Sequence, residues 1–192
     1  PQVGGIVKLT GFILKTSLII EMIGAALLAP VFCNDLGIAK GLWYSLFHSI
    51  SAFCNAGFDL FGIKEPFSSL TFYHSNIYLN IIIMLLIITG GIGFLVWGDI
   101  RTHKHRIGHF SLQSKVVLMT SAVLIVLPAL YFFFCEYDHE TIHDRTIHSL
   151  FQSVTTRTAG FNTTDLAAMD ESGTAIMIIL MLIGGSPGST AG

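Results

Sequence analysis

The sequence predicts an all-α membrane protein in which long apolar helices alternate with short helices that enter the membrane and return. Of its 192 residues, 52% are hydrophobic and only 11% are charged, and the mean hydropathy is +0.70. A soluble domain carries about 25% charged residues. Several apolar runs reach the roughly 20 residues that a spanning helix requires, and a short polar segment occurs twice between such runs.

The repeated segment occupies residues 46–58 and 150–161. Aligned from their first residues, both copies begin Leu-Phe, and Ser49 and Ser153 then occupy equivalent positions. Aligned from their last residues, both end Ala-Gly-Phe, and the second copy is one residue shorter in between. A constant start and end with a one-residue slip predicts a short helix followed by a loop.

Each copy is too short, and too rich in Ser, Thr and Asn, to cross a bilayer, yet each lies between apolar runs. We therefore expect both copies to dip into the membrane and return. Irregular backbone at membrane depth is tolerated only where protein or a water-filled cavity covers its polar groups. The repeat therefore predicts the lining of a pore.

The first apolar run covers residues 3–32, and we expect Pro30 to close it and residues 34–37 to form a turn. Glu21 lies deep enough in this run to require a partner or water. A hydrogen bond between helices is the favoured role for Glu21, and a carboxylate on an ion pathway is the alternative. The first short helix is expected over residues 43–53, with aromatic residues near the lipid headgroups.

The second long span is expected over residues 77–97, with small residues near its end that allow close helix packing, namely Gly90, Gly91 and Gly93. A third span is expected over residues 116–135, with Pro128 as a tolerated kink. The last apolar run begins near Thr174 and breaks into a Gly-rich segment at residues 184–192. A helix interrupted by that segment cannot be regular.

Charge predicts the orientation of the spans. Residues 99–115 contain four Lys or Arg and one acid, whereas the segments on the opposite side are mainly acidic. Because Lys and Arg concentrate in cytoplasmic loops, we expect this basic stretch and the N-terminus inside, and both short helices to enter from outside. The localisation that follows is a multi-pass protein of the cell membrane. A net charge of -2 argues against a nucleic-acid partner.

Three motifs together carry a resemblance to a known family. They are Phe-His-Ser-Ile-Ser-Ala-Phe-Cys-Asn-Ala-Gly-Phe at residues 47–58, Phe-Gln-Ser-Val-Thr-Thr-Arg-Thr-Ala-Gly-Phe-Asn at residues 151–162, and Gly-Gly-Ser-Pro-Gly-Ser-Thr-Ala-Gly at residues 184–192. With the order of spans and short helices, the chain resembles the Ktr/Trk/HKT superfamily of potassium transporters, and within it the KtrB-type membrane subunit. The resemblance covers the whole chain.

The family arrangement implies that each unit is a membrane helix, a re-entrant pore helix with its filter loop, and a second membrane helix. Four such units surround one pore, and this chain resembles the second unit and most of the third. Residues 1–100 then form the first unit present, residues 101–115 a cytoplasmic basic linker, and residues 116–192 a second unit without the end of its last helix.

The resemblance also implies the site residues. The ion-binding filter comprises Asn55, Ala56, Gly57, Phe58, Thr158, Ala159, Gly160 and Phe161. The intramembrane gating loop comprises Gly184, Gly185, Ser186, Gly188, Ser189, Thr190, Ala191 and Gly192. No catalytic residue, no structural metal and no covalent cofactor are expected.

The resemblance implies K⁺ as the transported ion, bound at the filter loops. Selectivity for K⁺ against Na⁺, and Na⁺ as a coupling or activating ion, are left open. The implied partners are membrane lipid, a second copy of the full-length subunit in a homodimer, and a cytosolic nucleotide-binding regulatory ring of the KtrA/TrkA type. Residues 101–109 are one candidate contact for the ring.

Physical chemistry supports a cation filter independently of the resemblance. A dehydrated cation needs backbone carbonyls in place of water, and turning them inward requires unusual dihedrals, which Gly57 and Gly160 adopt at little cost. The short helices end at these loops, so their C-terminal partial negative charge of roughly half an elementary charge faces the path of the ion. This arrangement favours a cation over an anion.

A second hypothesis, from another class of protein, is a membrane-embedded zinc metalloprotease. His139, Glu140 and His143 match the pattern H-E-x-x-H, in which two histidines one helical turn apart bind zinc and the glutamate acts as base. Here the pattern lies in a short acidic segment with no evident long helix to hold it. A solvated extracellular loop is therefore the favoured interpretation of these residues.

Overall fold

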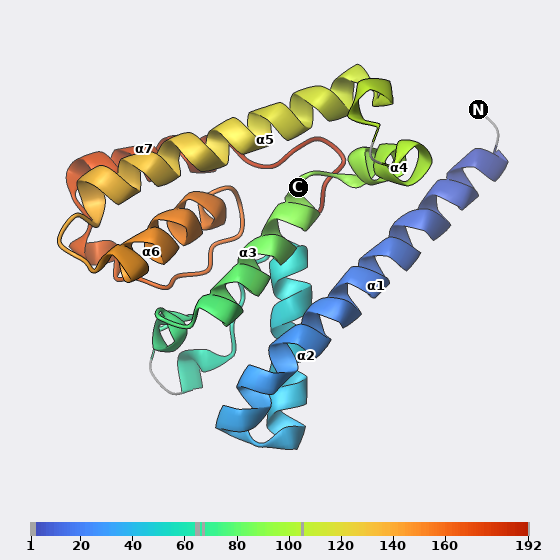
Figure 1. The fold of residues 1–192 in the computed structure, drawn as a ribbon. Coiled ribbons are helices and arrows are strands. Elements are labelled where there is room, and N and C mark those ends of the chain that lie inside the picture. The colour runs from blue at the N-terminus through green and yellow to red at the C-terminus, as the bar shows by residue number, and fades with distance from the viewer. Residues whose placement is uncertain (1–2, 64–65, 67, 105, 192) are drawn as a thin grey trace.

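The computed structural model describes residues 3–63, 66, 68–104 and 106–191. Gly192, the last residue of the predicted gating loop, lies outside the described residues. Within them, every regular element is helical (Figure 1). The α-helices are α1 (Val3–Leu36), α2 (Ile38–Phe53), α3 (Ile77–Gly91), α4 (Phe94–His103), α5 (Leu112–Tyr131), α6 (Ile142–Thr155) and α7 (Glu171–Ile183).

The helices α1 and α2 form a tight hairpin in which Gly37 alone separates them. The sequence predicts that Pro30 closes the first span, but α1 continues through Pro30 to Leu36. A proline inside a helix removes one hydrogen bond and kinks the helix without always ending it. The chain reverses at Gly37, the last residue of the predicted turn, and its φ of 80° lies in the left-handed region.

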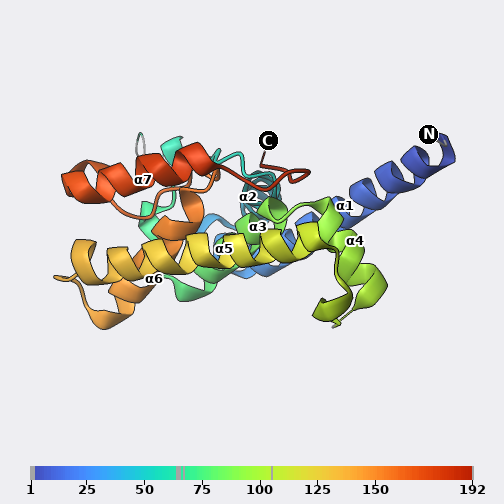
Figure 2. The same cartoon turned by 90° about the horizontal axis from the view of Figure 1, so that it is seen from above.

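Much of the α1 surface is apolar and exposed in this chain, as at Leu14, Leu18 and Met22. In water such a surface would be a liability, because soluble proteins rarely expose large contiguous apolar patches. In a membrane protein such a surface is compatible with contact to lipid. The N-terminal half of α1 extends beyond the tightly packed helices (Figures 1 and 2), and its Phe12 ring lies 5.3 Å from the guanidinium carbon of Arg101 in α4.

The second span is not a single helix. The sequence predicts one run over residues 77–97, but α3 and α4 are separated by a break at which the axis turns by 93°. Gly93 occupies the break with a φ of 88°, a conformation that residues with a Cβ disfavour. The glycines here were expected to allow close packing, and they also permit a bend that the apolar pattern alone does not reveal.

The helices α5, α6 and α7 form the second part of the fold. After Tyr131, α5 continues into one π-helical turn, Phe132–Glu136, and Pro128 lies inside the helix as the sequence predicts. Both views show α7 beside α5, with α6 packed next to them (Figures 1 and 2). The helix α7 is short, and the chain leaves it toward the centre of the molecule.

The largest group of buried apolar side chains joins the two halves of the chain. It includes Phe32 and Phe53 from the first half and Phe151, Val154 and Phe161 from the second. A smaller group surrounds Phe132, Tyr137, Met177 and Leu180, between the end of α5 and the helix α7. The core therefore centres on α3, which packs against both short helices, α2 and α6.

Among the described residues, two helical segments are long and apolar enough to cross a membrane, Val7–Leu36 and Leu112–Glu136. The bent pair of α3 and α4 makes a third if it is counted as one span. The start of α1, the end of α4 and the start of α5 lie toward one end of the molecule (Figure 1). The turn between α1 and α2 and the connection between α5 and α6 lie toward the other end.

The first prediction concerns orientation. In a full-length protein without native cysteines, we expect Ser75→Cys to react with an impermeant thiol reagent added outside the cell. Thr102→Cys should react only after the membrane is opened, because it lies in the basic stretch. Both positions are exposed on the protein surface, so accessibility differs only by the side of the membrane. The opposite labelling pattern would reverse the proposed orientation.

Candidate functional site

The two loops that follow the short helices have the same backbone pattern. In the first loop (residues 54–58), Asn55 and Gly57 have φ values of 51° and 69°. In the second loop (residues 157–161), the equivalent residues Thr158 and Gly160 have φ values of 90° and 86°. A β-branched residue such as Thr158 rarely has a positive φ. Strain of this kind persists where the surrounding structure imposes it, often at functional sites.

A hydroxyl group of each short helix holds the end of its loop. Ser51 Oγ donates to the carbonyl of Phe58 at 2.7 Å, and Thr155 Oγ1 donates to the carbonyl of Phe161 at 2.8 Å. These residues occupy equivalent positions of the repeat. Each bond closes the loop back onto the helix that precedes it. A net contribution of about 0.5–1.5 kcal/mol is typical for such a bond.

A second pair of equivalent hydroxyls anchors the short helices to the long ones. Ser49 Oγ donates to the carbonyl of Glu21 in α1 at 2.7 Å, and Ser153 Oγ donates to the carbonyl of Ile125 in α5 at 2.6 Å. The repeated serines therefore attach each short helix to the long helix of its own half. Glu21 also accepts a long contact of 3.9 Å from Cys54 Sγ, which agrees with the favoured helix-to-helix role.

The two loops lie directly against each other. A Cβ added to Gly57 would collide with the carbonyl oxygen of Ala159 and would lie 3.1 Å from the Cα of Gly160. Beyond the loops, the amide of Leu70 donates to the carbonyl of Asn162 at 2.9 Å, and the amide of Asn162 donates to Ser69 Oγ at 3.1 Å. The structure thus brings together the two sets of residues that the sequence assigns to one filter.

Their exposure differs in this chain. Phe161 is fully buried, whereas Phe58 is 71% exposed. Ala159 is buried and Ala56 is exposed. The second loop is therefore covered at Ala159 and Phe161, whereas its Gly160 is exposed, and the first loop is exposed at Ala56 and Phe58.

The Gly-rich segment (residues 184–191) returns from α7 to the end of the first short helix. Thr190 Oγ1 donates to the carbonyl of Phe53 at 2.6 Å, and Asn55 Nδ2 lies 3.3 Å from the same Thr190 oxygen. The Asn55 amide also reaches the carbonyls of Phe53 and Ile87, each at 3.4 Å. Asn55 therefore connects the first loop, the helix α3 and the Gly-rich segment.

The same segment also packs on the break between α3 and α4. The amide of Ser186 donates to the carbonyl of Gly91 at 3.2 Å, and the amide of Phe94 donates to the carbonyl of Gly188 at 2.9 Å. The amide of Thr190 donates to the carbonyl of Gly90 at 3.3 Å. These bonds satisfy backbone groups that the break in the helix leaves free, as burial in a membrane requires.

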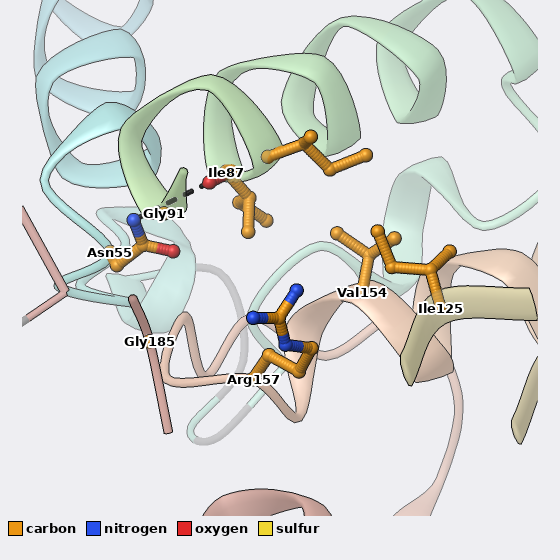
Figure 3. Close-up of a pocket in the computed structure, with 8 residues that line it drawn as sticks. Asn55, Ile87, Gly91, Ile125, Val154, Arg157 and Gly185 are labelled. Atoms are coloured by element: carbon orange, nitrogen blue, oxygen red, sulfur yellow. Dashed lines mark hydrogen bonds between the residues drawn. The ribbon is translucent and has the colours of Figure 1, made fainter. Parts of the chain in front are cut away.

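A small cavity lies where these elements meet (Figure 3). It offers about 10 Å³ to the centre of a water molecule, which is room for about one water. Asn55 and Arg157 point into it from different sides, and Gly91 and Gly185 line it. The cavity therefore borders both loops and the Gly-rich segment.

The sequence leads us to expect that Arg157 points away from the loops and pairs, with Asp165 as one candidate. The side chain instead points into the cavity (Figure 3). Among the described residues Arg157 forms no ion pair, and its Nε has no hydrogen-bond partner. Asp165 instead accepts a bond from the amide of Ala167 at 2.9 Å. The sequence alone does not reveal this partner of Asp165.

The two residues that follow Leu-Phe in the repeat are buried and hydrogen-bonded. His48 Nδ1 donates to the carbonyl of Tyr44 at 2.7 Å, and its Nε2 accepts the amide of Leu60 at 3.4 Å. Gln152 Nε2 lies 3.1 Å from the sulfur of Met177. His48 therefore forms hydrogen bonds within the packing of the first short helix.

The residues of the H-E-x-x-H pattern do not assemble a zinc site. The helix α6 begins at Ile142, so His139 lies outside it, and His139 and His143 instead lie 3.6 Å from Asp138 and 3.2 Å from Asp144. Within the described part of the chain, no group of three or more His, Cys, Asp or Glu side chains is placed to hold a metal. The pattern therefore does not form the pair of histidines one helical turn apart that the metalloprotease hypothesis requires.

Nearby, burial raises the pKa of the Tyr137 hydroxyl to about 12. Tyr137 is therefore neutral at physiological pH, and its hydroxyl lies 3.1 Å from Thr164 Oγ1.

Several residues of this arrangement were not assigned a role from the sequence. They are the hydroxyl residues of the two short helices, Ser49, Ser51, Ser153 and Thr155. The alignment of the two copies could have indicated them, because Ser49 aligns with Ser153 and Ser51 aligns with Thr155. What the sequence lacked was the direction of each hydroxyl and the carbonyl that accepts its bond.

The fold and the loops define a class of membrane protein in which short helices end within the membrane and present backbone loops there. The chain belongs to the TrkH family of cation transport proteins, which it matches over residues 2–192. The family consists of transporters and not of enzymes. The chain is thus part of a multi-pass membrane protein.

Curated relatives agree with this assignment. The chain is 41% identical to the potassium/sodium uptake protein NtpJ of Enterococcus hirae, over 100% of the chain and 42% of that protein. It is 38% identical to the Ktr system potassium uptake protein B of Bacillus subtilis, over 100% of the chain and 43% of that protein. The corresponding protein of Vibrio alginolyticus is 34% identical over 96% of the chain and 41% of its own length. The chain therefore spans less than half the length of these relatives.

The second prediction concerns the contact between the Gly-rich segment and α3. We expect Gly90→Ala to lower the Tm of the full-length protein, because its Cβ would collide with the carbonyl of Phe53 and would lie 2.7 Å from Thr190 Oγ1. Overpacking of this kind typically costs about 1–3 kcal/mol.

The matched control is Gly98→Ala, a helical glycine with no atom within 4 Å of an added Cβ. Thermal unfolding of both variants, followed by the loss of the monodisperse species, gives the comparison. An equal Tm for Gly90→Ala and the wild type would contradict the packing described above.

Proposed function

We propose that the full-length protein carries K⁺ into the cell, and that the two loops form two parts of its selectivity filter. The observation that carries this proposal is the identical backbone pattern of two loops in contact, with positive φ at Asn55, Gly57, Thr158 and Gly160. Relatives named for potassium or potassium/sodium uptake support the same ion class. The filter residues are then Asn55 to Phe58 and Thr158 to Phe161.

Alternating ordinary and left-handed residues let successive carbonyls turn toward the same side of the chain. A ring of such carbonyls replaces the hydration shell of a dehydrated cation. The C-termini of α2 and α6 lead into the loops, so the negative ends of two helix dipoles add to the attraction. The hydroxyls of Ser51 and Thr155 hold the loop ends, which keeps the spacing of the carbonyls constant.

We also propose that residues 184–192 gate the ion path from the cytoplasmic side of the filter. The support is the contact of Thr190 with Phe53 and Asn55, directly behind the first loop. The Gly-rich composition permits a change of backbone conformation at small steric cost. The half-buried positive charge of Arg157 lies at the same cavity, where it would oppose the presence of a cation.

The remaining proposals concern the whole assembly. Residues 1–100 and 116–192 are proposed as two of four pore units, joined by the basic residues 101–115 on the cytoplasmic side.

The name of the Bacillus subtilis relative describes a Ktr system, which supports a subunit that works with further components. We propose a homodimer of the full-length subunit and a nucleotide-binding cytosolic ring as those components. Na⁺ is proposed as a coupling or activating ion, since one relative is named for both ions.

The third prediction tests the filter. We expect Gly160→Ser and Gly57→Ser in the full-length protein to reduce K⁺ uptake or its preference over Na⁺. A Cβ in the left-handed region costs about 1–2 kcal/mol, which corresponds to roughly a five- to thirtyfold change in an equilibrium constant. Gly160→Ser is the cleaner variant, because only the Cα of Gly57, at 3.9 Å, lies near its added Cβ.

Two control variants test whether a loss of uptake comes from the positive φ of the filter glycines, and not from general backbone strain or from an added hydroxyl. Gly37→Ser introduces similar backbone strain, at a φ of 80°, with no atom within 4 Å and far from the loops. Ala56→Ser adds a hydroxyl inside the first loop at a residue that already has a Cβ. Uptake is measured in a potassium-requiring cell, with K⁺ alone and with Na⁺ competing. Unchanged uptake and selectivity in both filter variants would remove these loops from the ion path.

The fourth prediction tests the hydroxyl groups that close the loops. We expect Ser51→Ala and Thr155→Val to reduce the preference for K⁺ over Na⁺ by about two- to tenfold, the range set by a lost bond of about 0.5–1.5 kcal/mol. Thr155→Val keeps the shape of the side chain and removes the hydroxyl.

Ser45→Ala is the matched control for these two variants. Ser45 is buried in the same short helix as Ser51, and its Oγ donates to the carbonyl of Gly41 at 2.7 Å, away from the loop. We expect this variant to keep wild-type selectivity. A loss of selectivity in Ser45→Ala equal to that in Ser51→Ala would mean that the loop contact is not the cause.

A further inference from the structure

Two polar side chains, one from each copy of the repeat, meet at the small cavity with polar atoms that have no partner. Asn55 belongs to the first loop and Arg157 begins the second, and both line the cavity. Among the described residues, neither Asn55 Oδ1 nor Arg157 Nε has a hydrogen-bond partner, and both atoms are buried. Figure 3 shows the Asn55 oxygen and the guanidinium group pointing into the cavity from different sides. A buried polar atom without a partner requires an explanation.

The orientation of the Asn55 amide is set by its neighbours. Its Nδ2 lies 3.4 Å from the carbonyl oxygens of Phe53 and of Ile87, and a carbonyl oxygen only accepts hydrogen bonds. The NH₂ group must therefore face these carbonyls, which leaves Oδ1 as an acceptor on the side of the cavity. Asn55 is only 7% exposed, so bulk water does not serve this oxygen.

The chemistry of the two groups selects the occupant of the cavity. Arg157 offers only donors and carries a permanent positive charge, whereas Asn55 Oδ1 offers only an acceptor. A cation would be repelled by the guanidinium group, and an anion would meet the lone pairs of the amide oxygen. A water molecule accepts from the first group and donates to the second. The space of about 10 Å³ suits about one water, and two polar partners are the minimum that holds it.

We propose that one buried water molecule bridges Arg157 and Asn55 Oδ1, and that Arg157 is thereby a positioning residue of the first filter loop. The inference rests on the proposed function, because it concerns how the filter is held. Asn55 has a φ of 51°, which is uncommon for a residue other than glycine, so its conformation needs support from its surroundings. The water bridge supplies that support from the second copy of the repeat.

The bridge also connects the filter to the Gly-rich segment. Asn55 Nδ2 lies 3.3 Å from Thr190 Oγ1, and Gly185 of the same segment lines the cavity. A shift of this segment therefore changes the surroundings of both the water and the amide that it holds. Arg157 directly precedes Thr158, whose φ is 90°, so the bridge joins the strained parts of both loops. Arg157 thus acts on selectivity through Asn55 and not by touching the ion.

The first test is a double-mutant cycle on the full-length protein, with Arg157→Met and Asn55→Gly. Methionine keeps much of the length of arginine without its donors, and glycine removes the amide while accepting a positive φ. We expect Arg157→Met alone to reduce the preference for K⁺ over Na⁺ about two- to tenfold, the range set by one lost hydrogen bond. In the Asn55→Gly background the same change should alter the preference less than about twofold. Equal effects in both backgrounds would overturn the proposal.

The Tm values of the same four proteins give a measure that does not depend on transport. Two groups joined by a bridge are coupled, so the double variant should lose less than the sum of the two single losses. Arg145→Met is the matched control, because Arg145 is half-buried like Arg157, but its guanidinium carbon lies 4.3 Å from the centre of the Phe133 ring. Its loss should add to that of Asn55→Gly. Additive losses for Arg157→Met and Asn55→Gly would overturn the proposal.

A structure of the full-length protein that resolves ordered water tests the bridge itself. We expect one water molecule within about 3.2 Å of both Asn55 Oδ1 and a guanidinium nitrogen of Arg157. An empty cavity, or a carboxylate from another part of the full-length chain on this guanidinium group, would overturn the proposal. Unchanged selectivity in Gly57→Ser and Gly160→Ser would instead remove the proposed function, while coupled Tm losses would still support the bridge.

Discussion

The contact between the backbones of the two loops is the constraint on which the rest of the structure depends. Irregular backbone within a membrane must be covered by protein, because lipid offers no hydrogen bonds. The carbonyl of Ala159 lies so close to Gly57 that no side chain fits between them. The apolar core around α3, which packs against both α2 and α6, supports this contact.

The two copies of the repeated segment are held by the same kinds of hydrogen bond. Ser49 and Ser153 attach each short helix to a carbonyl of the long helix before it, while Ser51 and Thr155 close each loop. Equivalent sequence positions thus form equivalent bonds in two halves of different sequence. Each bond is modest in energy, but together they allow strained residues such as Thr158 to keep their conformation.

Much of the fold follows from apolar runs and the repeat. The short helices, the long spans and the break after Ile183 were predicted near their observed positions, because lipid imposes a minimum length on a spanning helix. The extension of α1 beyond Pro30 and the 93° bend at Gly93 were not predicted. The extension and the bend both depend on neighbouring segments that supply or replace backbone hydrogen bonds. The composition of a helix does not say where such a segment lies.

By itself the sequence determined the class of protein, the pairing of residues 46–58 with residues 150–161, and the glycines whose dihedrals the loops need. Only the tertiary structure decided that Arg157 points into the cavity at Asn55, and that Glu140 lies against His148. The physical reason is that periodicity and dihedral preference are local properties of the chain. The partner of a hydroxyl, a guanidinium or an imidazole depends on packing between segments that are distant in sequence.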